Sequence, residues 1–193
     1  MENRLINYFS RISNLSTEES LGISESMIIK KFKKGSFLLK EGQTCADSYF
    51  ILEGCIRQYS IVDGEEKTTD FFTEEQWVIS LNSLSYNNPS NYFWICNEDS
   101  SLVVGNEQKA QDLFKQFPRF EKISREVVAR VFVEQQQKMT SFMTDSPEQR
   151  YIKLLESRPY LFQRIPQYQL ASYIGVKPES LSRIRRRISL NGL

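Results

Sequence analysis

Histidine is absent from the 193 residues of this protein. Without imidazole the chain cannot build a Ser-His-Asp triad, a Cys-His nucleophile pair or a histidine-ligated metal site. A catalytic jelly roll of the cupin kind usually holds its metal through histidines, so that class of enzyme is disfavoured too. We therefore expect no enzymatic activity, no metal site and no cofactor.

Cysteine is scarce, and its three positions, Cys45, Cys55 and Cys96, match neither a C-x-x-C metal knuckle nor an even-numbered disulfide framework. Three thiolates are also one short of the four that an iron-sulfur cluster needs from one chain. We interpret them as free thiols in a reducing compartment. The sequence therefore predicts a cytoplasmic protein.

Long hydrophobic runs are missing as well. The longest uncharged stretch, residues 76–97, has 22 residues, and eleven of them are Gln, Asn, Ser or Pro. Such a segment is too polar to cross a bilayer, which takes about 20 predominantly apolar residues. The N-terminus lacks the basic region and apolar core of a signal peptide. We expect no association with a membrane.

The net charge of +1 hides a separation of charge along the chain. Residues 1–149 carry 16 Lys and Arg against 22 Asp and Glu, whereas residues 150–193 carry nine against two. A small basic module behind a mildly acidic body is typical of a nucleic-acid reader attached to another domain.

Local patterns predict helices, then a sheet, then helices again. Ser16 followed three residues later by Glu19 forms a capping-box pattern. Between about residue 30 and residue 104, short aromatic and β-branched runs alternate with glycines, as in an all-β sandwich or barrel. Asp63-Gly64 predicts a hairpin turn there. Ser146-Pro147 predicts the start of a further helix.

Residues 119–144 are predicted to form one amphipathic helix of 26 residues. An apolar stripe of that length more often pairs with a second helix, and two copies would form a short coiled coil. The alternative is that the stripe packs on its own barrel. The residues predicted to face a partner are Ile123, Val127, Val131, Gln135, Met139 and Phe142, with Gln135 as a polar interruption.

Residues 165–188 predict a helix, a tight turn and a second helix. Gly175 supplies the left-handed residue that ends the first helix, and Pro178 can open the next one. On the second helix, apolar residues share one face and arginines share the opposite face.

A cationic helix face suits the major groove of double-stranded DNA, where arginine donates a bidentate pair to guanine and other cations contact phosphates. We expect double-stranded DNA as the partner of this segment. The predicted contact residues are Lys177, Glu179, Ser180, Ser182, Arg183, Arg186 and Arg187.

Residues 170–183, read as Leu-Ala-x-x-Ile-Gly-Val-x-x-Glu-Ser-Leu-Ser-Arg, resemble the helix-turn-helix of the Crp/Fnr superfamily of bacterial transcription regulators. Upstream, Tyr49-Phe50-Ile51-Leu52-x-Gly54 and Asp63-Gly64 resemble the cyclic-nucleotide-binding fold of that family.

The resemblance implies an α+β protein with three parts. They are an N-terminal β jelly-roll effector domain (1–118), a dimerisation helix (119–145) and a C-terminal helix-turn-helix domain (146–193). It also implies a homodimer on a palindromic operator, with base contacts from Glu179 and Arg183 and RNA polymerase as a further candidate partner. Because few residues follow the second helix of the motif, we expect the wing of the family to be rudimentary or missing.

Residues 77–91 correspond to the cassette in which members that bind cyclic AMP carry a phosphate-binding Arg and a ribose-binding Glu. Neither residue type is present here. High-affinity binding of cyclic AMP is therefore not expected, because a buried phosphate needs a cation. A small effector of another kind remains a candidate ligand. The residues proposed to line its pocket are Arg57, Ser80, Ser83 and Ser90, with core packing or a solvated loop as the alternative.

A second interpretation of the whole chain stays open. The protein would be a small-metabolite or cyclic-nucleotide receptor that signals through protein contacts, and its DNA module would be degenerate. Affinity for DNA separates the two interpretations.

Overall fold

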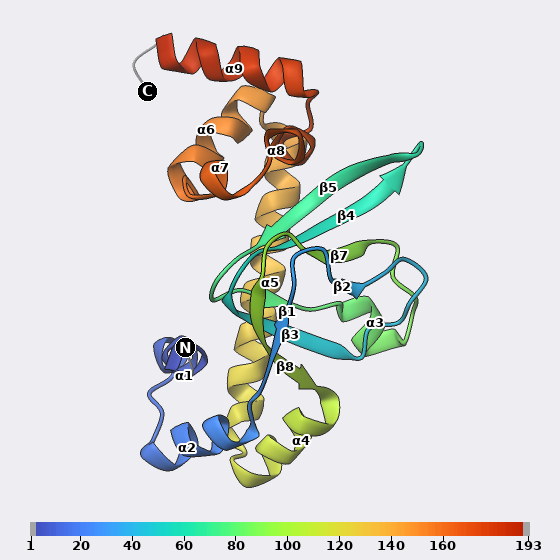
Figure 1. The fold of residues 1–193 in the computed structure, drawn as a ribbon. Helices are drawn as coiled ribbons and strands as arrows, with labels where there is room; N and C mark the ends of the chain where they lie inside the picture. The colour runs from blue at the N-terminus through green and yellow to red at the C-terminus, as the bar shows by residue number, and fades with distance from the viewer. Residues whose placement is uncertain (1–2, 191–193) are drawn as a thin grey trace. The chain divides into compact units, whose positions relative to one another are not determined.

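The structure, a computed structural model, describes residues 3–190 as two four-stranded antiparallel sheets and a series of helices (Figure 1). The chain divides into two compact units. Unit 1 comprises Met1–Gln58 and Phe71–Phe132, and unit 2 comprises Tyr59–Asp70 and Val133–Leu193. No helix in the described part of the chain combines the length and apolarity needed to cross a bilayer.

Helices open and close the chain, and the strands lie between them. In chain order the elements are α1 (Asn3–Ile12), α2 (Thr17–Ser26), β1 (Ile28–Phe32), β2 (Phe37–Leu39), β3 (Asp47–Glu53), β4 (Ile56–Val62), β5 (Glu65–Phe72), β6 (Trp77–Val78), α3 (Leu81–Tyr86), β7 (Phe93–Cys96), β8 (Ser100–Asn106), α4 (Glu107–Gln116), α5 (Arg119–Thr144), α6 (Pro147–Ser157), α7 (Leu161–Arg164), α8 (Gln167–Ile174) and α9 (Pro178–Leu190).

The strand order is β1-β8-β3-β6 in the first sheet and β2-β7-β4-β5 in the second. Side chains alternate between the faces of a strand, so β3 serves two cores. Tyr49 and Ile51 belong to a cluster with residues of the second sheet, including Trp94, which we call the roll core. Phe50 and Leu52 belong to a cluster with residues of α1, α2 and α5, which we call the helix core.

Several local predictions are confirmed. The Ser16 hydroxyl accepts from the backbone N–H of Glu19 at 3.1 Å, and the Glu19 carboxylate accepts from the N–H of Ser16 at 2.7 Å. Asp63 and Gly64 both have positive φ, 54° and 78°, as a two-residue hairpin turn of this kind requires. Ser146 caps α6, and α5 spans the predicted residues 119–144.

The prediction that the wing is rudimentary or missing stays a prediction. It concerns the residues that follow α9, and 191–193 lie outside the described residues.

Candidate nucleic-acid interface

The turn between α8 and α9 is built by Gly175. Its φ of 81° and ψ of 35° lie in the left-handed region, which suits a residue without a Cβ. The N–H of Val176 donates to the Ala171 carbonyl at 2.9 Å, which satisfies the end of α8. Pro178 then begins α9, where its fixed φ suits the first turn. The predicted helix, turn and helix are confirmed.

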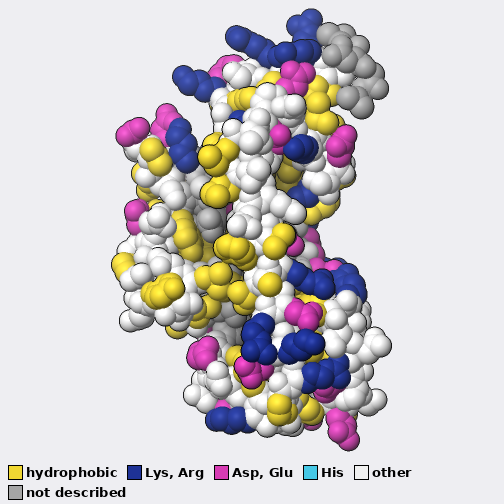
Figure 2. All heavy atoms as spheres, turned by 180° about the vertical axis from the view of Figure 1, so that it is seen from behind, with side chains coloured by type: hydrophobic (Ala, Val, Ile, Leu, Met, Phe, Trp, Pro, Cys, Tyr) yellow, Lys and Arg dark blue, Asp and Glu magenta, His cyan; other side chains and the backbone are white. Residues whose placement is uncertain are grey.

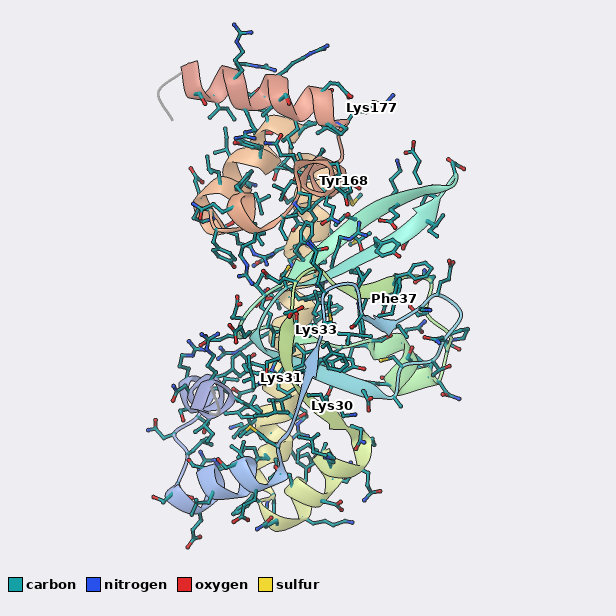
Figure 3. All side chains as sticks on the ribbon, in the orientation of Figure 1. Lys30, Lys31, Lys33, Phe37, Tyr168 and Lys177 are labelled. Atoms are coloured by element: carbon teal, nitrogen blue, oxygen red, sulfur yellow. The ribbon has the colours of Figure 1, made fainter. Side chains whose placement is uncertain are left out.

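The two faces of α9 are separated as predicted. Leu181, Ile184 and Ile188 are 1%, 6% and 4% exposed, so they anchor the helix. Ser180 is half-buried. The remaining predicted DNA-contacting side chains are exposed: Lys177, Glu179, Ser182, Arg183, Arg186 and Arg187. Figure 2 shows Lys and Arg side chains gathered at the top, over α9, and Figure 3 shows Lys177 at its start.

The arginines of α9 differ in their surroundings. The guanidinium of Arg187 forms an ion pair with the carboxylate of Glu148 on α6, with Nη1 3.0 Å from Oε2. Within the described residues, Arg183, Arg185 and Arg186 form no ion pair. These three cations are therefore available to an external anion, whereas Arg187 is already held in place.

The tip of the β4-β5 hairpin lies against the helix-turn-helix within unit 2. The hydroxyl of Ser172 on α8 accepts from the backbone N–H of Thr68 at 2.9 Å and donates to the carbonyl of Glu66 at 3.3 Å. The pKa of Glu65 is lowered mainly by its hydrogen bond from Lys67 and also by the charge of Lys177. The role of Ser172 could not be predicted from the sequence, because no local pattern links a helix to a hairpin about one hundred residues away.

A buried carboxylate in unit 2 was also missed. Asp70 on β5 is 1% exposed. It accepts two hydrogen bonds from the ammonium of Lys138 on α5, at 3.0 and 2.7 Å, and one from the Gln135 amide at 3.0 Å. Burial, and secondarily the charge of Asp70, raises the pKa of Tyr173. Gln135, predicted as a polar interruption in a dimer stripe, therefore also holds strand β5.

The predicted dimer stripe of α5 divides into two parts. Ile123 and Val127 are 2% and 4% exposed, and Ile123 packs into the helix core of unit 1. Val131 is half-buried. Further along the helix apolar side chains are exposed, and they include two residues of the predicted stripe together with three others: Phe132, Val133, Met139, Phe142 and Met143. The packing of the first part matches the alternative interpretation of the stripe.

The serines proposed for an effector pocket are buried and hydrogen-bonded to their neighbours. The hydroxyl of Tyr92 donates to Ser80 Oγ at 2.7 Å, and the Ser80 hydroxyl donates to Ser83 Oγ at 3.1 Å. Ser90 Oγ donates to the carbonyl of Tyr92 at 2.9 Å. The structure thus brings three of the four residues into one cluster around Tyr92. Arg57 lies on β4 and is 4% exposed.

The roll core is filled by aromatic side chains. Trp94 is fully buried, with its ring centroid 6.3 Å from that of Tyr49 and 5.5 Å from that of Tyr92. The Trp94 indole N–H donates to Gln58 at 2.8 Å. Large side chains therefore occupy the space between the two sheets.

Comparison with known proteins agrees with this architecture. The cyclic nucleotide-binding domain family matches residues 29–117. The transcriptional activator protein anr of Pseudomonas aeruginosa is 24% identical over 197 residues, covering 93% of this chain and 78% of that protein.

Solved structures show the same fold. The c-di-GMP responsive global regulator CLP of Xanthomonas campestris superposes with a TM-score of 0.69 at 13% identity, covering 92% of this chain and 94% of CLP. FixK2 of Bradyrhizobium japonicum gives 0.69 at 15% identity, covering 86% of each chain.

A cyclic-nucleotide-binding-like roll, a long helix and a C-terminal helix-turn-helix with one cationic face define a class of regulators that join a sensing domain to a DNA-binding domain. The chain resembles these regulators over most of its length: residues 29–117 match the cyclic nucleotide-binding domain family, and the whole fold is similar to that of Crp/Fnr regulators.

Proposed function

We propose that the protein binds double-stranded DNA as a homodimer, reads a palindromic operator with α9, and is not an enzyme. The observation that supports this most directly is that α9 has one apolar face and one cationic face. Its apolar face is buried by unit 2, and its opposite face carries Arg183, Arg185 and Arg186 with no ion pair among the described residues.

The chemistry of this face fits base reading. Arg183 and Arg186 lie within one turn of each other, and arginine donates a bidentate pair to guanine O6 and N7 in the major groove. Glu179, at the N-terminal end of α9, can accept from cytosine N4. Arg185, Lys177 and Ser180 are placed to contact phosphates. Arg187, which Glu148 orients, and Ser182 complete the proposed surface.

The second half of α5 supports the homodimer. Phe132, Gln135, Met139 and Phe142 follow the 3-4-3 spacing of a coiled-coil seam, and the three apolar members are at least half exposed. The other three residues of the predicted stripe precede this seam along α5: Ile123, Val127 and Val131. In a two-fold symmetric dimer the two recognition helices read half-sites about one helical turn, ~34 Å, apart.

The remaining proposals concern the sensing domain and the setting. A small effector would bind in the roll near Arg57, Ser80, Ser83 and Ser90 and shift the population of DNA-binding dimers. Operation on bacterial DNA places the protein in the cytoplasm and makes RNA polymerase a candidate partner. The proposed parts are the effector domain 1–118, the dimerisation helix 119–145 and the DNA-binding domain 146–193.

The first experiment is enrichment of sheared genomic DNA by the purified protein, compared with Arg183→Ala. Arg125→Ala is the matched control, because it removes the same charge from α5, where the Arg125 side chain is 72% exposed and pairs with Glu121 on its own helix. We expect the wild type and Arg125→Ala to enrich the same two-fold symmetric sequence. Arg183→Ala should lose that enrichment, since a lost bidentate base contact costs about 1–3 kcal/mol of discrimination.

Equal enrichment by all three proteins would show that Arg183 reads no base. Absence of enrichment by the wild type would contradict operator binding by the protein alone and favour a receptor that signals through protein contacts.

A further inference from the structure

A cavity lies in unit 1, on the outer face of the first sheet. It is walled by residues of α1, α2, β3, β6, α3, β8, α4 and the first turns of α5, and its volume is about 280 Å³. Phe50 and Val103, which point to this face, belong to the helix core, whereas Tyr49 and Val104 belong to the roll core. The cavity therefore lies on the helix-core side of the first sheet, although Val104 of the roll core also lines it.

The walls of the cavity are mostly apolar. They include Leu5, Phe9, Ile23, Leu113, Phe120 and Val127. Apolar walls with a few polar groups are typical of small-molecule sites, whose volumes run from about 300 to 1,000 Å³. At roughly 30 Å³ for a water-sized group, the cavity accommodates a body of about nine heavy atoms.

The polar residues that line the cavity are the donors Lys109 and Trp77, one carboxylate, Glu107, and side chains that can donate or accept: Ser26, Ser48, Asn106 and Ser124. Lys109 on α4 lines it, and within the described residues its ammonium has no carboxylate partner. The carboxylate of Glu107 lines the cavity too, and it already accepts from the Gln111 amide at 2.8 Å. Trp77 also lines the cavity, and its indole N–H is buried without an acceptor among the described residues. A buried donor of this kind is costly until an acceptor reaches it.

From this pattern we propose that the cavity binds a monocarboxylic acid with an apolar body of about eight carbons. The hydrocarbon lies among the apolar walls of unit 1. The carboxylate accepts a charge-assisted hydrogen bond from Lys109, which is roughly twice as strong as a neutral one. The site involves neither α9 nor the coiled-coil seam, so it stands apart from the proposed DNA reading.

The test is calorimetric titration of the full-length protein with sodium octanoate in the absence of DNA, together with thermal melting. We expect saturable binding of one octanoate per chain and a rise in the melting temperature, since a ligand that binds only the folded state stabilises it. 1-Octanol and octylamine, of the same chain length, should bind at least tenfold more weakly because neither offers an anion.

Three variants locate the site. Lys109→Met should weaken octanoate binding at least tenfold. Lys115→Met, which removes an exposed lysine of the same helix that pairs with Asp112, should leave binding unchanged. Ala110→Trp should abolish it by filling the cavity that Ala110 lines.

The proposal is overturned if the wild type shows no saturable octanoate binding, if Lys109→Met and Lys115→Met bind equally, or if octanol binds as tightly as octanoate. Persistence of binding in a folded Ala110→Trp variant would also overturn it, because the ligand would then lie elsewhere.

Discussion

Single residues show how burial sorts the charges of this protein. Asp70 is 1% exposed and is held by Lys138 and Gln135, whereas Arg183, Arg185 and Arg186 stand in solvent. A buried charge must be paired to be tolerated, while an exposed one costs little and stays available to a partner. The first kind of charge is paired inside unit 2, and the second kind is available for the proposed recognition of DNA.

The first residue-scale prediction concerns the Asp70 to Lys138 pair. Lys138→Met removes two hydrogen bonds from a buried carboxylate. We expect a loss of about 2 kcal/mol in unfolding free energy, below the ~3–5 kcal/mol of a fully buried pair, because the Lys138 side chain is 28% exposed. Urea unfolding of the wild type and of Lys138→Met measures this loss in unfolding free energy.

Lys122→Met, an exposed change on the same helix, serves as the control and should shift stability by less than about 0.5 kcal/mol. Adding Asp70→Asn to Lys138→Met should restore part of the loss. Equal stability of the two single lysine variants would show that the pair contributes nothing.

The second prediction concerns the cysteines, all three of which are free and buried. Burial raises the pKa of the Cys96 thiol from 9.0 to about 11. The folded state therefore favours the neutral thiol, and this contribution to stability is fully present below pH 9 and declines as the pH rises toward 11. At pH 8 a disulfide reagent should label no cysteine in the folded protein.

After unfolding in guanidinium chloride, three thiols per chain should react rapidly. Rapid labelling of Cys96 in the native state at pH 8 would show that its thiol is accessible.

The faces of α9 could be predicted residue by residue, because helical periodicity places Leu181, Ile184 and Ile188 on one side with no knowledge of the fold. The Asp70 site could not. Its partners Gln135 and Lys138 lie 65 and 68 residues away along the chain, and only the tertiary structure brings them together.

At the scale of elements, the turns and caps carry much of the information. Gly175 and Gly64 both adopt positive φ, 81° and 78°, yet their surroundings differ. A Cβ on Gly175 would lie 3.1 Å from the Phe142 ring and 3.3 Å from the Arg150 guanidinium, whereas a Cβ on Gly64 would have no atom within 4 Å. Comparing substitutions at these two glycines therefore separates the cost of backbone strain from the cost of steric contact.

We predict that Gly64→Ala costs about 1 kcal/mol from the left-handed backbone alone. Gly175→Ala should cost at least about 1 kcal/mol more, because Phe142 and Arg150 must shift to admit the methyl group. Chemical unfolding of both variants, followed by circular dichroism, measures the difference. Equal losses would mean that the ring and guanidinium move aside freely.

Elements with local signals could be predicted, and those without them could not. The capping residues of α2 and α6 and the Asp63-Gly64 turn act within a few residues, so the sequence reveals them. Strand β1 was missed because it lies at the edge of its sheet, where four of its five residues are exposed and no alternation appears. Helix α3 was missed within the uncharged stretch, because its six residues are too few for a periodic pattern.

At the scale of the whole molecule, the proposed homodimer depends on the exposed apolar residues of α5. Met139 is 62% exposed at the centre of the proposed seam. Met139→Glu would place two carboxylates against each other across a two-fold axis, and we expect it to shift the dimer to monomers. Sedimentation velocity measures the change in mass.

Tyr86→Glu provides the control, because Tyr86 is 75% exposed on α3 and lies outside the seam. This variant should sediment as the wild type does. A dimeric Met139→Glu protein would exclude the seam as the dimer interface.

The division of the α5 stripe could not be predicted from periodicity. The apolar pattern continues from Ile123 to Phe142, but a pattern does not reveal which part meets the chain's own core. The structure buries Ile123 and Val127 and exposes Met139 and Phe142.

The placement of the two tryptophans gives the molecule a pair of built-in optical reporters. Trp94 lies in the roll core and Trp77 packs against the helix core, so one indole senses each side of the first sheet. Emission from a protein carrying only Trp77 should respond to events at the outer cavity, and emission from one carrying only Trp94 should respond to events between the sheets. The fold thus lets the two proposed ligand sites be followed separately by light alone.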